Sequence, residues 1–263
     1  MKTIRITAQG LGTLMMLSLT LTACSDDSSN IGTDKAPHWE VTMPTSNAPE
    51  WNLPTEEEDD PTSSMAVTAA LIDAEGHYAS ASGGTLAALA QGECVGKAQA
   101  TKNTADPHDL FYLYVHKPRN YPAESSITLA YYDPATRRTL YWPNATDYAK
   151  DAIRGTFDTP FRLDLTTAFP YPYVSFVLAT LPEEVRSVRG KDDECAVFAD
   201  GLCCGLLVTP DPNRGIDLGD EVSFPTPDTK FQVRYYCAAL HRILESPLIS
   251  RNADDYYIDA VLK

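Results

Sequence analysis

Cysteine is the residue type whose spacing in this chain most suggests chemistry. Four of the six cysteines fall in the last third of the 263 residues: Cys195, Cys203, Cys204 and Cys237. In an oxidising compartment such a group favours a disulfide, although spacing alone leaves the pairing open. The alternative is a set of buried thiols that act as small apolar residues, which is our interpretation of Cys94. A zinc site fits poorly, because neighbours on a strand point to opposite faces. We expect no metal and no other cofactor.

Aromatic side chains are the second group with possible chemistry. Tyr141 and Trp142 precede Pro143 at the expected end of a hairpin. Further tyrosines lie in and after residues 166–172, at 171 and 173, and near the end of the chain, at 256 and 257. An exposed tyrosine or tryptophan face can stack on a sugar ring or pack against a partner protein. We therefore take Tyr141 and Trp142 as the candidate ligand platform, with simple packing inside a strand as the alternative.

Acidic residues are numerous, but they do not form a catalytic pattern. Asp211, Asp217 and Asp220 share one loop that lacks the regular spacing of a calcium-binding loop, so a solvated acidic surface is the better interpretation. Whether any calcium binds stays open. The chain has no G-x-S-x-G motif, and its five histidines do not form H-E-x-x-H. The sequence predicts a protein that is not an enzyme.

An internal repeat indicates how these residues are positioned. The pattern A-x-x-A-x-G-x-C-x-G occurs at 87–96 and again at 196–205, and the surrounding residues 65–98 and 174–207 align without a gap. A repeat of roughly 100 residues has the size of a domain and is too long for a solenoid unit. We expect two related modules at residues 64–165 and 173–263. Residues 166–172, with two prolines, would be a short, stiff linker.

Period-two patterns predict strands throughout both modules. Met65, Val67 and Ala69 alternate with smaller or polar residues, as in a half-buried strand. Asp200-Gly201 is a strong signal for a two-residue hairpin turn, which would pair Phe198 with Cys203 and place Cys204 opposite residue 197. Many short strands with glycine and proline turns predict an all-β chain of two tandem immunoglobulin-like antiparallel β-sandwiches, with about seven strands each.

The N-terminus predicts export and a lipid anchor. Residues 1–23 combine Lys2 and Arg5 with the apolar stretch 11–21, which is typical of a signal peptide. The small residues before Cys24 resemble a lipoprotein box, in which Cys24 receives the lipid. Asp26-Asp27 is similar to the signal that sends lipoproteins of the Bacteroidetes type to the cell surface. The resemblance implies an outer-membrane lipoprotein, exposed at the surface.

We expect residues 24–63 to form a lipidated, partly disordered tether, because they are rich in serine, threonine, proline and acidic residues. Trp39 and Trp51 are unusual in a linker. We expect part of 38–53 to pack along the first module, with a pure tether as the alternative. Loss of residues 1–23 leaves 19 basic against 36 acidic residues, a net charge of −17. So acidic a chain argues against nucleic acid as a partner.

Four strand-like segments of the first module resemble a known type of module. They are 64–69, 86–98, 111–115 and 127–133. Their succession is similar to a recurrent immunoglobulin-like module of Bacteroidetes surface lipoproteins, which are described as cell adhesion proteins. The second copy departs from it by Cys237 in place of Asp133 and by the additional Cys204. The resemblance implies the fold and the location, and it says little about a ligand.

These observations predict a lipid-anchored cell-surface binding or adhesion protein without catalytic activity. Its partners would be the membrane, through the lipid on Cys24, and an extracellular protein or glycan. The alternative function is that of a glycan-binding accessory lipoprotein of a polysaccharide-uptake system. Exposed aromatic rings in a groove would favour the glycan, whereas a flat apolar patch or a free strand edge would favour a protein partner.

Overall fold

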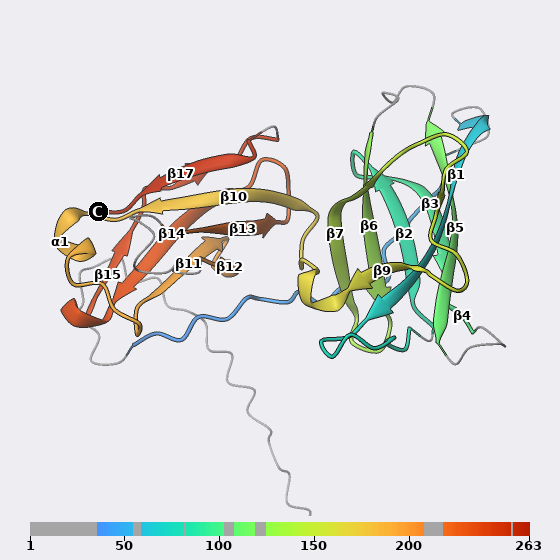
Figure 1. Ribbon diagram of the computed structural model, residues 1–263. Helices are drawn as coiled ribbons and strands as arrows, with labels where there is room; N and C mark the ends of the chain where they lie inside the picture. The colour runs from blue at the N-terminus through green and yellow to red at the C-terminus, as the bar shows by residue number, and fades with distance from the viewer. Residues whose placement is uncertain are drawn as a thin grey trace, which may run out of the picture.

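The protein is predominantly β, with several sheets whose strands mostly run antiparallel (Figure 1). The computed structural model describes residues 36–54, 59–81, 83–102, 108–118, 125–207, 218–253 and 255–263, with backbone alone at 59–62 and 117–118. The predicted signal peptide, Cys24, Asp26-Asp27, Asp211 and Asp217 lie outside these residues. None of the described helices is long and apolar enough to cross a membrane.

The first half of the molecule consists of two sheets that enclose a hydrophobic core. One sheet has the order β4-β5-β1-β8, with β9 also paired to β1; the other has the order β3-β2-β6-β7. The core includes Met65, Leu86, Phe111 and Ile127. The strands are β1 (Asp59–Ile72), β2 (Thr85–Ala90), β3 (Glu93–Gln99), β4 (Thr101–Lys102), β5 (Asp109–Pro118), β6 (Ser126–Asp133), β7 (Arg138–Asp147), β8 (Ile153–Arg154) and β9 (Phe161–Asp164).

The second half encloses a separate core, which shares no residue with the first. Its sheets have the orders β13-β10-β17 and β12-β11-β14-β15, with β16 also paired to β14. The strands are β10 (Tyr173–Thr180), β11 (Glu194–Ala199), β12 (Leu202–Leu206), β13 (Leu218–Phe224), β14 (Lys230–Cys237), β15 (Arg242–Glu245), β16 (Ile249–Ser250) and β17 (Tyr257–Val261). The described residues also include three short helical turns: η1 (Leu165–Thr167), α1 (Glu183–Arg186) and η2 (Ala238–Leu240).

The two halves repeat one topology. In the first, β1 lies between an antiparallel β5 and a parallel β9; in the second, β10 lies between an antiparallel β13 and a parallel β17. The other sheet places a hairpin beside a third strand, β6 or β14. The expectation of purely antiparallel sheets is therefore wrong for the last strand of each half, and also for β8, which runs parallel to β1. The chain crosses from the opposite sheet after β7 in the first half and after β16 in the second, and the strands that follow run in the same direction as the first strand.

The repeated motif builds the same irregular hairpin in both halves. Residues 91–92 and 200–201 have positive φ angles, as a two-residue type I′ turn requires. The predicted pair Phe198–Cys203 is present, but a β-bulge then places Val197 opposite Gly205 and leaves Cys204 as the additional residue. A Cβ atom on Gly96 would lie 2.5 Å from the Tyr114 carbonyl oxygen, so glycine is required where the two sheets approach.

Residues 36–54, which we call the strap, lie across both halves (Figure 1, blue). The strap has no regular secondary structure, and Pro44 and Pro49 favour an extended backbone. Trp51 makes the expected contact with the first half, whereas Trp39 packs on the second half. The segment predicted as a tether therefore connects the two halves.

Candidate binding cleft

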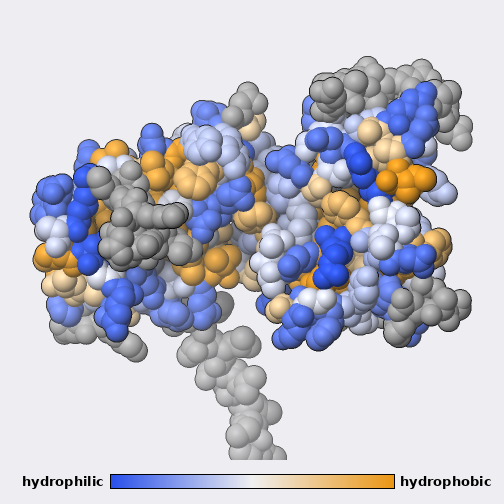
Figure 2. All heavy atoms as spheres, in the orientation of Figure 1, coloured by the Kyte–Doolittle hydropathy of each residue, from blue (hydrophilic) through white to orange (hydrophobic). Residues whose placement is uncertain are grey.

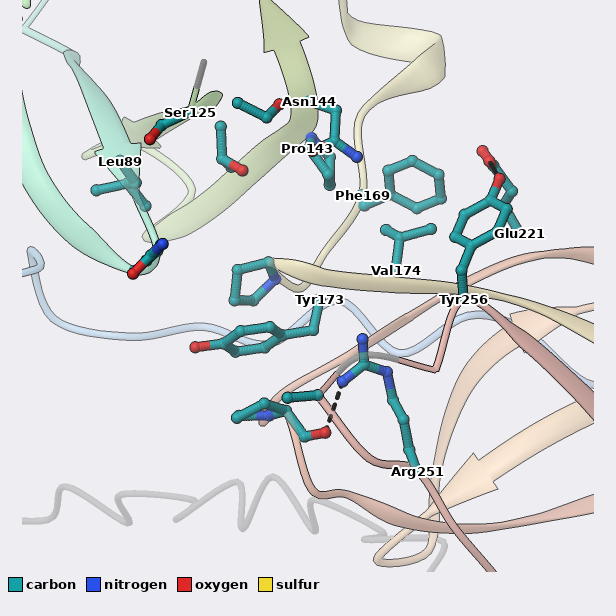
Figure 3. Close-up of a pocket in the computed structure, with 17 residues that line it drawn as sticks. Leu89, Ser125, Pro143, Asn144, Phe169, Tyr173, Val174, Glu221, Arg251 and Tyr256 are labelled. Carbon is teal, nitrogen blue, oxygen red and sulfur yellow. Dashed lines mark hydrogen bonds between the residues drawn. The ribbon is translucent and has the colours of Figure 1, made fainter. Parts of the chain in front are cut away.

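A cleft of about 1040 Å³ lies between the two halves, and both contribute to its walls (Figure 3). The first half supplies the turn residue Gln91 and the β7 residue Asn144. The connecting segment supplies Phe169, and β10 supplies Tyr173 at its first residue. The second half supplies Arg251 and Tyr256.

The connecting segment is fixed in place, so the aromatic residues of the cleft have defined positions. Phe169 and Tyr141 form an isolated β-bridge, with two backbone hydrogen bonds of 2.8 Å each. Tyr171 then enters the core of the second half. The segment predicted as a stiff linker is thus attached to β7 at one end and to the second core at the other. Tyr173 follows two residues after Tyr171 and faces the cleft (Figure 3).

Arg251 gives the cleft a positively charged group. The residue is only 4% exposed, and among the described residues it is the one buried lysine or arginine. Its Nε donates to Ser175 Oγ (2.8 Å) and its Nη1 to the Pro227 carbonyl (2.6 Å). The guanidinium group also lies 5.8 Å from the centre of the Tyr173 ring. Burial lowers the pKa of Arg251, which nevertheless starts from so high a value that the group is charged at neutral pH.

Tyr256 and Glu221 add an acidic partner on the same side of the cleft. The Tyr256 hydroxyl donates to Glu221 Oε1 at 2.6 Å. This hydrogen bond to a carboxylate, helped by desolvation, raises the pKa of Tyr256 to about 12. The phenol is therefore neutral at physiological pH. The cleft offers both one cation and one anion, besides its aromatic rings.

The first half lines the cleft with small polar groups. Ser125, Ser126 and Thr128 bring hydroxyls, and Asn144 brings an amide. Asn144 has a positive φ of 52°, a conformation that asparagine tolerates better than most residues. The Ser126 hydroxyl is buried and has no hydrogen-bond partner among the described residues. A buried donor without a partner is costly, so Ser126 is suited to a ligand group or a bound water.

The predicted aromatic platform is not present. Trp142 is only 7% exposed, packs in the first core, and donates from its indole Nε1 to the Asp164 carbonyl at 2.8 Å. Tyr141 is half-buried beside Trp51 on the outer face of the same sheet. Adjacent residues of a strand face opposite sides of the sheet, and here Trp142 faces the core while Tyr141 faces outward. Neither of the two residues lines the cleft, whereas Pro143 and Asn144, which follow them, do.

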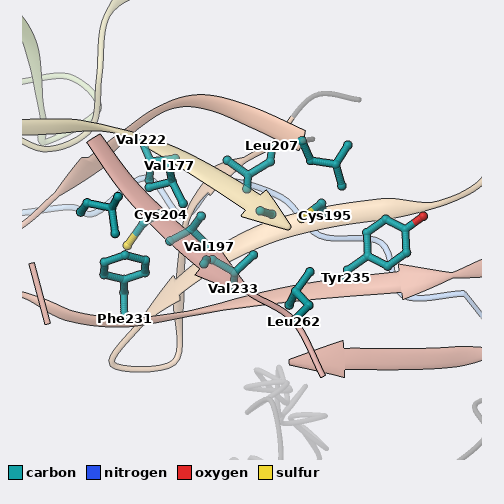
Figure 4. Packing of buried hydrophobic residues seen from close by; sticks show 14 of the residues in the cluster. Val177, Cys195, Val197, Cys204, Leu207, Val222, Phe231, Val233, Tyr235 and Leu262 are labelled. Atoms are coloured by element: carbon teal, nitrogen blue, oxygen red, sulfur yellow. The ribbon is translucent and has the colours of Figure 1, made fainter. Parts of the chain in front are cut away.

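The candidate disulfide is not formed, because all five described cysteines are free and buried. Cys195, Cys204 and Cys237 lie in the core of the second half, where Cys204 stands beside Phe231 (Figure 4). Cys203 lies on the outer face under Trp39. Burial raises the pKa of Cys195 to about 12 and that of Cys204 to about 11, so both are protonated thiols that pack as apolar groups.

The described carboxylates do not form a cation site. No group of three or more histidine, cysteine or acidic residues in the described part of the chain is placed to hold a metal ion. Asp220, one of the three loop aspartates, accepts a hydrogen bond from the Glu221 backbone N–H at 2.8 Å.

Most of the cleft was not evident from the sequence. The tyrosines near the linker and at 256–257 were visible as a cluster of aromatic residues, but nothing indicated that they would meet. Arg251 reaches Ser175 across 76 positions of sequence, and its spacing carries no signal. An arginine between Ser250 and Asn252 in a loop gives no hint of burial.

The comparisons with known proteins do not assign the chain to a family. No family model matches the sequence, and no curated protein matches it. The fold and the cleft are therefore the grounds for a functional proposal.

Proposed function

We propose that this chain is a non-catalytic binding protein, attached to the outer membrane by a lipid on Cys24 and exposed at the cell surface. The leader sequence and the acidic pair after Cys24 support the location. Two packed sheets around a separate core in each half support a tandem pair of immunoglobulin-like sandwiches. Two copies of one scaffold that meet at a cleft are suited to binding.

The ligand class that fits the cleft best is a glycan. Phe169, Tyr173 and Tyr256 bring aromatic rings on which the C–H face of a sugar can stack. Around them lie hydroxyl and amide groups, which exchange hydrogen bonds with sugar hydroxyls. One guanidinium and one carboxylate add charge-assisted hydrogen bonds. A volume of about 1040 Å³ exceeds that of a single small molecule and accommodates several sugar units.

A single observation carries this proposal: both halves and the segment between them converge on one cleft whose walls combine aromatic rings with hydroxyl, amide and charged groups. A glycan array with the soluble protein, begun after Cys24, tests it directly. Oligosaccharides that bind should do so with a dissociation constant of about 10 μM to 1 mM, as expected for a few such contacts. Tyr173→Ala should weaken binding at least tenfold, while Tyr114→Ala, which truncates an exposed tyrosine of β5 outside the cleft, should leave binding unchanged. Equal loss in both variants, or binding by neither the variants nor the wild type, would contradict the proposal.

A protein partner is the second candidate, favoured by the outer face of the sheet β13-β10-β17. Tyr257 is 75% exposed and lies 5.5 Å, centre to centre, from the ring of Phe176, which covers Gly219. β17 pairs only with β10 among the described strands, so its other edge is available. Figure 2 shows apolar patches on both halves, separated by hydrophilic residues. Tyr257→Ser should abolish protein adhesion and leave glycan binding intact.

A further inference from the structure

Trp39 anchors the strap to the second half. Its indole packs on Ala196, Phe198 and Cys203, on the outer face of the sheet that contains β11 and β12. The ring meets Phe198 edge to face at 5.5 Å between centres. The Trp39 backbone N–H donates to Glu194 Oε2 (3.0 Å), and three residues later the Thr42 N–H donates to the Cys203 carbonyl (2.8 Å). The strap thus joins the edge strand β12 as well as the groove beside it.

Trp51 anchors the strap to the first half in the same manner. Its indole packs, as Tyr141 does, against a group of buried outer-face residues: Ala87, Leu89, Cys94 and Ala130. Lys97 Nζ on the edge strand β3 donates to the Trp51 carbonyl at 2.6 Å. Nearby, the Ser46 N–H donates to the Arg137 carbonyl (2.8 Å), and the Arg137 side chain donates to Asn47 Oδ1 (3.0 Å).

The two tryptophan grooves occupy equivalent positions in the internal repeat. Ala87 matches Ala196, Leu89 matches Phe198, and Cys94 matches Cys203, all at an offset of 109 residues. Each cysteine thiol donates to the carbonyl of the motif glycine two residues later. The motif therefore has a second role besides the hairpin: its small alanine and cysteine side chains leave room for an indole ring.

We propose that the duplication produced one tryptophan-binding groove on each half, and that the strap fills both grooves and so acts as a two-point latch across the cleft. This inference rests on the proposed function only in its statement of which ligand the cleft binds. Without the strap, segment 166–172, which the Tyr141–Phe169 bridge attaches to β7, would be the single chain connection between the halves. The strap adds a second connection, and the 12 residues from Trp39 to Trp51 span at most about 40 Å, which limits how far the halves can separate.

Because the strap is bound at two grooves, the loss of one tryptophan should release only part of it. While one tryptophan stays bound, the other is kept near its groove at high effective concentration. Trp39→Ala should therefore release only the N-terminal part of the strap, and Trp51→Ala only the part near the first half. Loss of both should free the whole segment and allow the halves to move. Neither tryptophan belongs to either main core, so the halves themselves should stay folded.

Limited proteolysis and solution scattering of the soluble full chain test the latch without any ligand. The double variant Trp39→Ala/Trp51→Ala should be cleaved within 36–54 at least tenfold faster than the wild type, and its scattering should show a larger radius of gyration. Leu53→Ala, which removes an exposed side chain of the same strap, is the matched control and should behave as the wild type. Circular dichroism should show unchanged strand content in all variants. A double variant with a protected strap and unchanged scattering would overturn the latch.

A peptide of residues 36–54 tests the grooves directly. Fluorescence anisotropy should show that the labelled peptide binds the double variant, and that the same peptide with both tryptophans replaced by alanine does not. Equal binding of the two peptides would overturn the assignment of the grooves. A glycan found on the array should bind the double variant at least tenfold more weakly than the wild type, because the cleft would no longer be held together. If the scattering changes but the glycan affinity does not, the strap does not hold the cleft in its binding form. If scattering and proteolysis change as expected but no variant or wild type binds glycan, the latch stands and the proposed function fails.

Discussion

The two halves share a topology and differ in what fills equivalent positions. In the first half, Leu86 and Val95 pack in the core; the matching residues of the second half are Cys195 and Cys204. On the outer face, Ala130 of the first groove corresponds to Arg234 in the second, which lies 4.9 Å from the centre of the Phe198 ring and forms an ion pair with Glu245 at 3.0 Å. The comparison shows that Cys195 and Cys204 take the places of apolar core residues and pack as they do.

Alanine substitution of the motif glycines should show the largest difference in stability between the halves. A Cβ on Gly96 meets a backbone oxygen at 2.5 Å, whereas on Gly205 it meets a Val222 methyl at 2.9 Å. Because a side chain yields more easily than backbone, Gly96→Ala should cost about 3 kcal/mol or more of unfolding free energy, and Gly205→Ala about 1–2 kcal/mol. Urea denaturation followed by circular dichroism measures both. Equal costs would contradict the closer approach of the sheets in the first half.

Much of the fold was predictable from this repeat. The hairpins, the pair Phe198–Cys203 and the separate cores follow from alternation, the Asp200-Gly201 turn and the 109-residue offset. The parallel last strands were not predictable, because local patterns carry no information on which strand a crossover will meet. The burial of Trp142 was missed for a related reason: alternation separates two faces of a strand without saying which of them faces the core.

The cleft and the packing of the strap were harder to predict from the sequence than the fold. Gln91 lines the same cleft as Tyr173 and Arg251 only because the two halves pack beside each other, and no short-range pattern encodes that arrangement. Trp39 and Trp51 were recognised as unusual in a tether. Each indole packs on the same three positions of the repeat, a long-range contact that no local pattern encodes.

The core positions offer a second comparison of the halves. Leu86→Ala should cost about 2–5 kcal/mol, because it leaves a cavity in the first core. Cys195→Ala removes only a sulfur atom from the equivalent position and should cost about 1–2 kcal/mol, scaled from the smaller volume. Chemical denaturation of each variant compares them. A loss at Cys195 as large as that at Leu86 would indicate that the thiol does more than fill space.

Alkaline pH should destabilise the second half through its buried cysteines. Burial raises the pKa of Cys195 to about 12 and of Cys204 to about 11, against 9 for a free thiol, so the folded state holds protons that the unfolded state releases. Their contribution to stability is complete below pH 9 and is lost as the pH rises through 11 to 12. Thermal melts from pH 8 to 11 should show a declining Tm, and Cys195→Ala/Cys204→Ala should flatten that decline. An identical slope in the variant would exclude these thiols as its cause.

Reducing agent should have the smallest effect. Since the described cysteines are free and buried, dithiothreitol at neutral pH should leave the Tm of the soluble protein unchanged within about 1 °C. Thiol titration in denaturant, without reductant, should find five free thiols in the chain that begins after Cys24. A drop of several degrees, with fewer thiols, would reveal a disulfide in the second half.

Hydrogen–deuterium exchange with a bound oligosaccharide tests the central claim most directly. The account predicts that ligand slows exchange at 169–174 and 251–256, where the segment between the halves and the Arg251 loop line the cleft. Exchange within β17 beyond Tyr257 should not change. Protection confined to β17 and the outer face around Phe176, with the cleft segments unaffected, would contradict it.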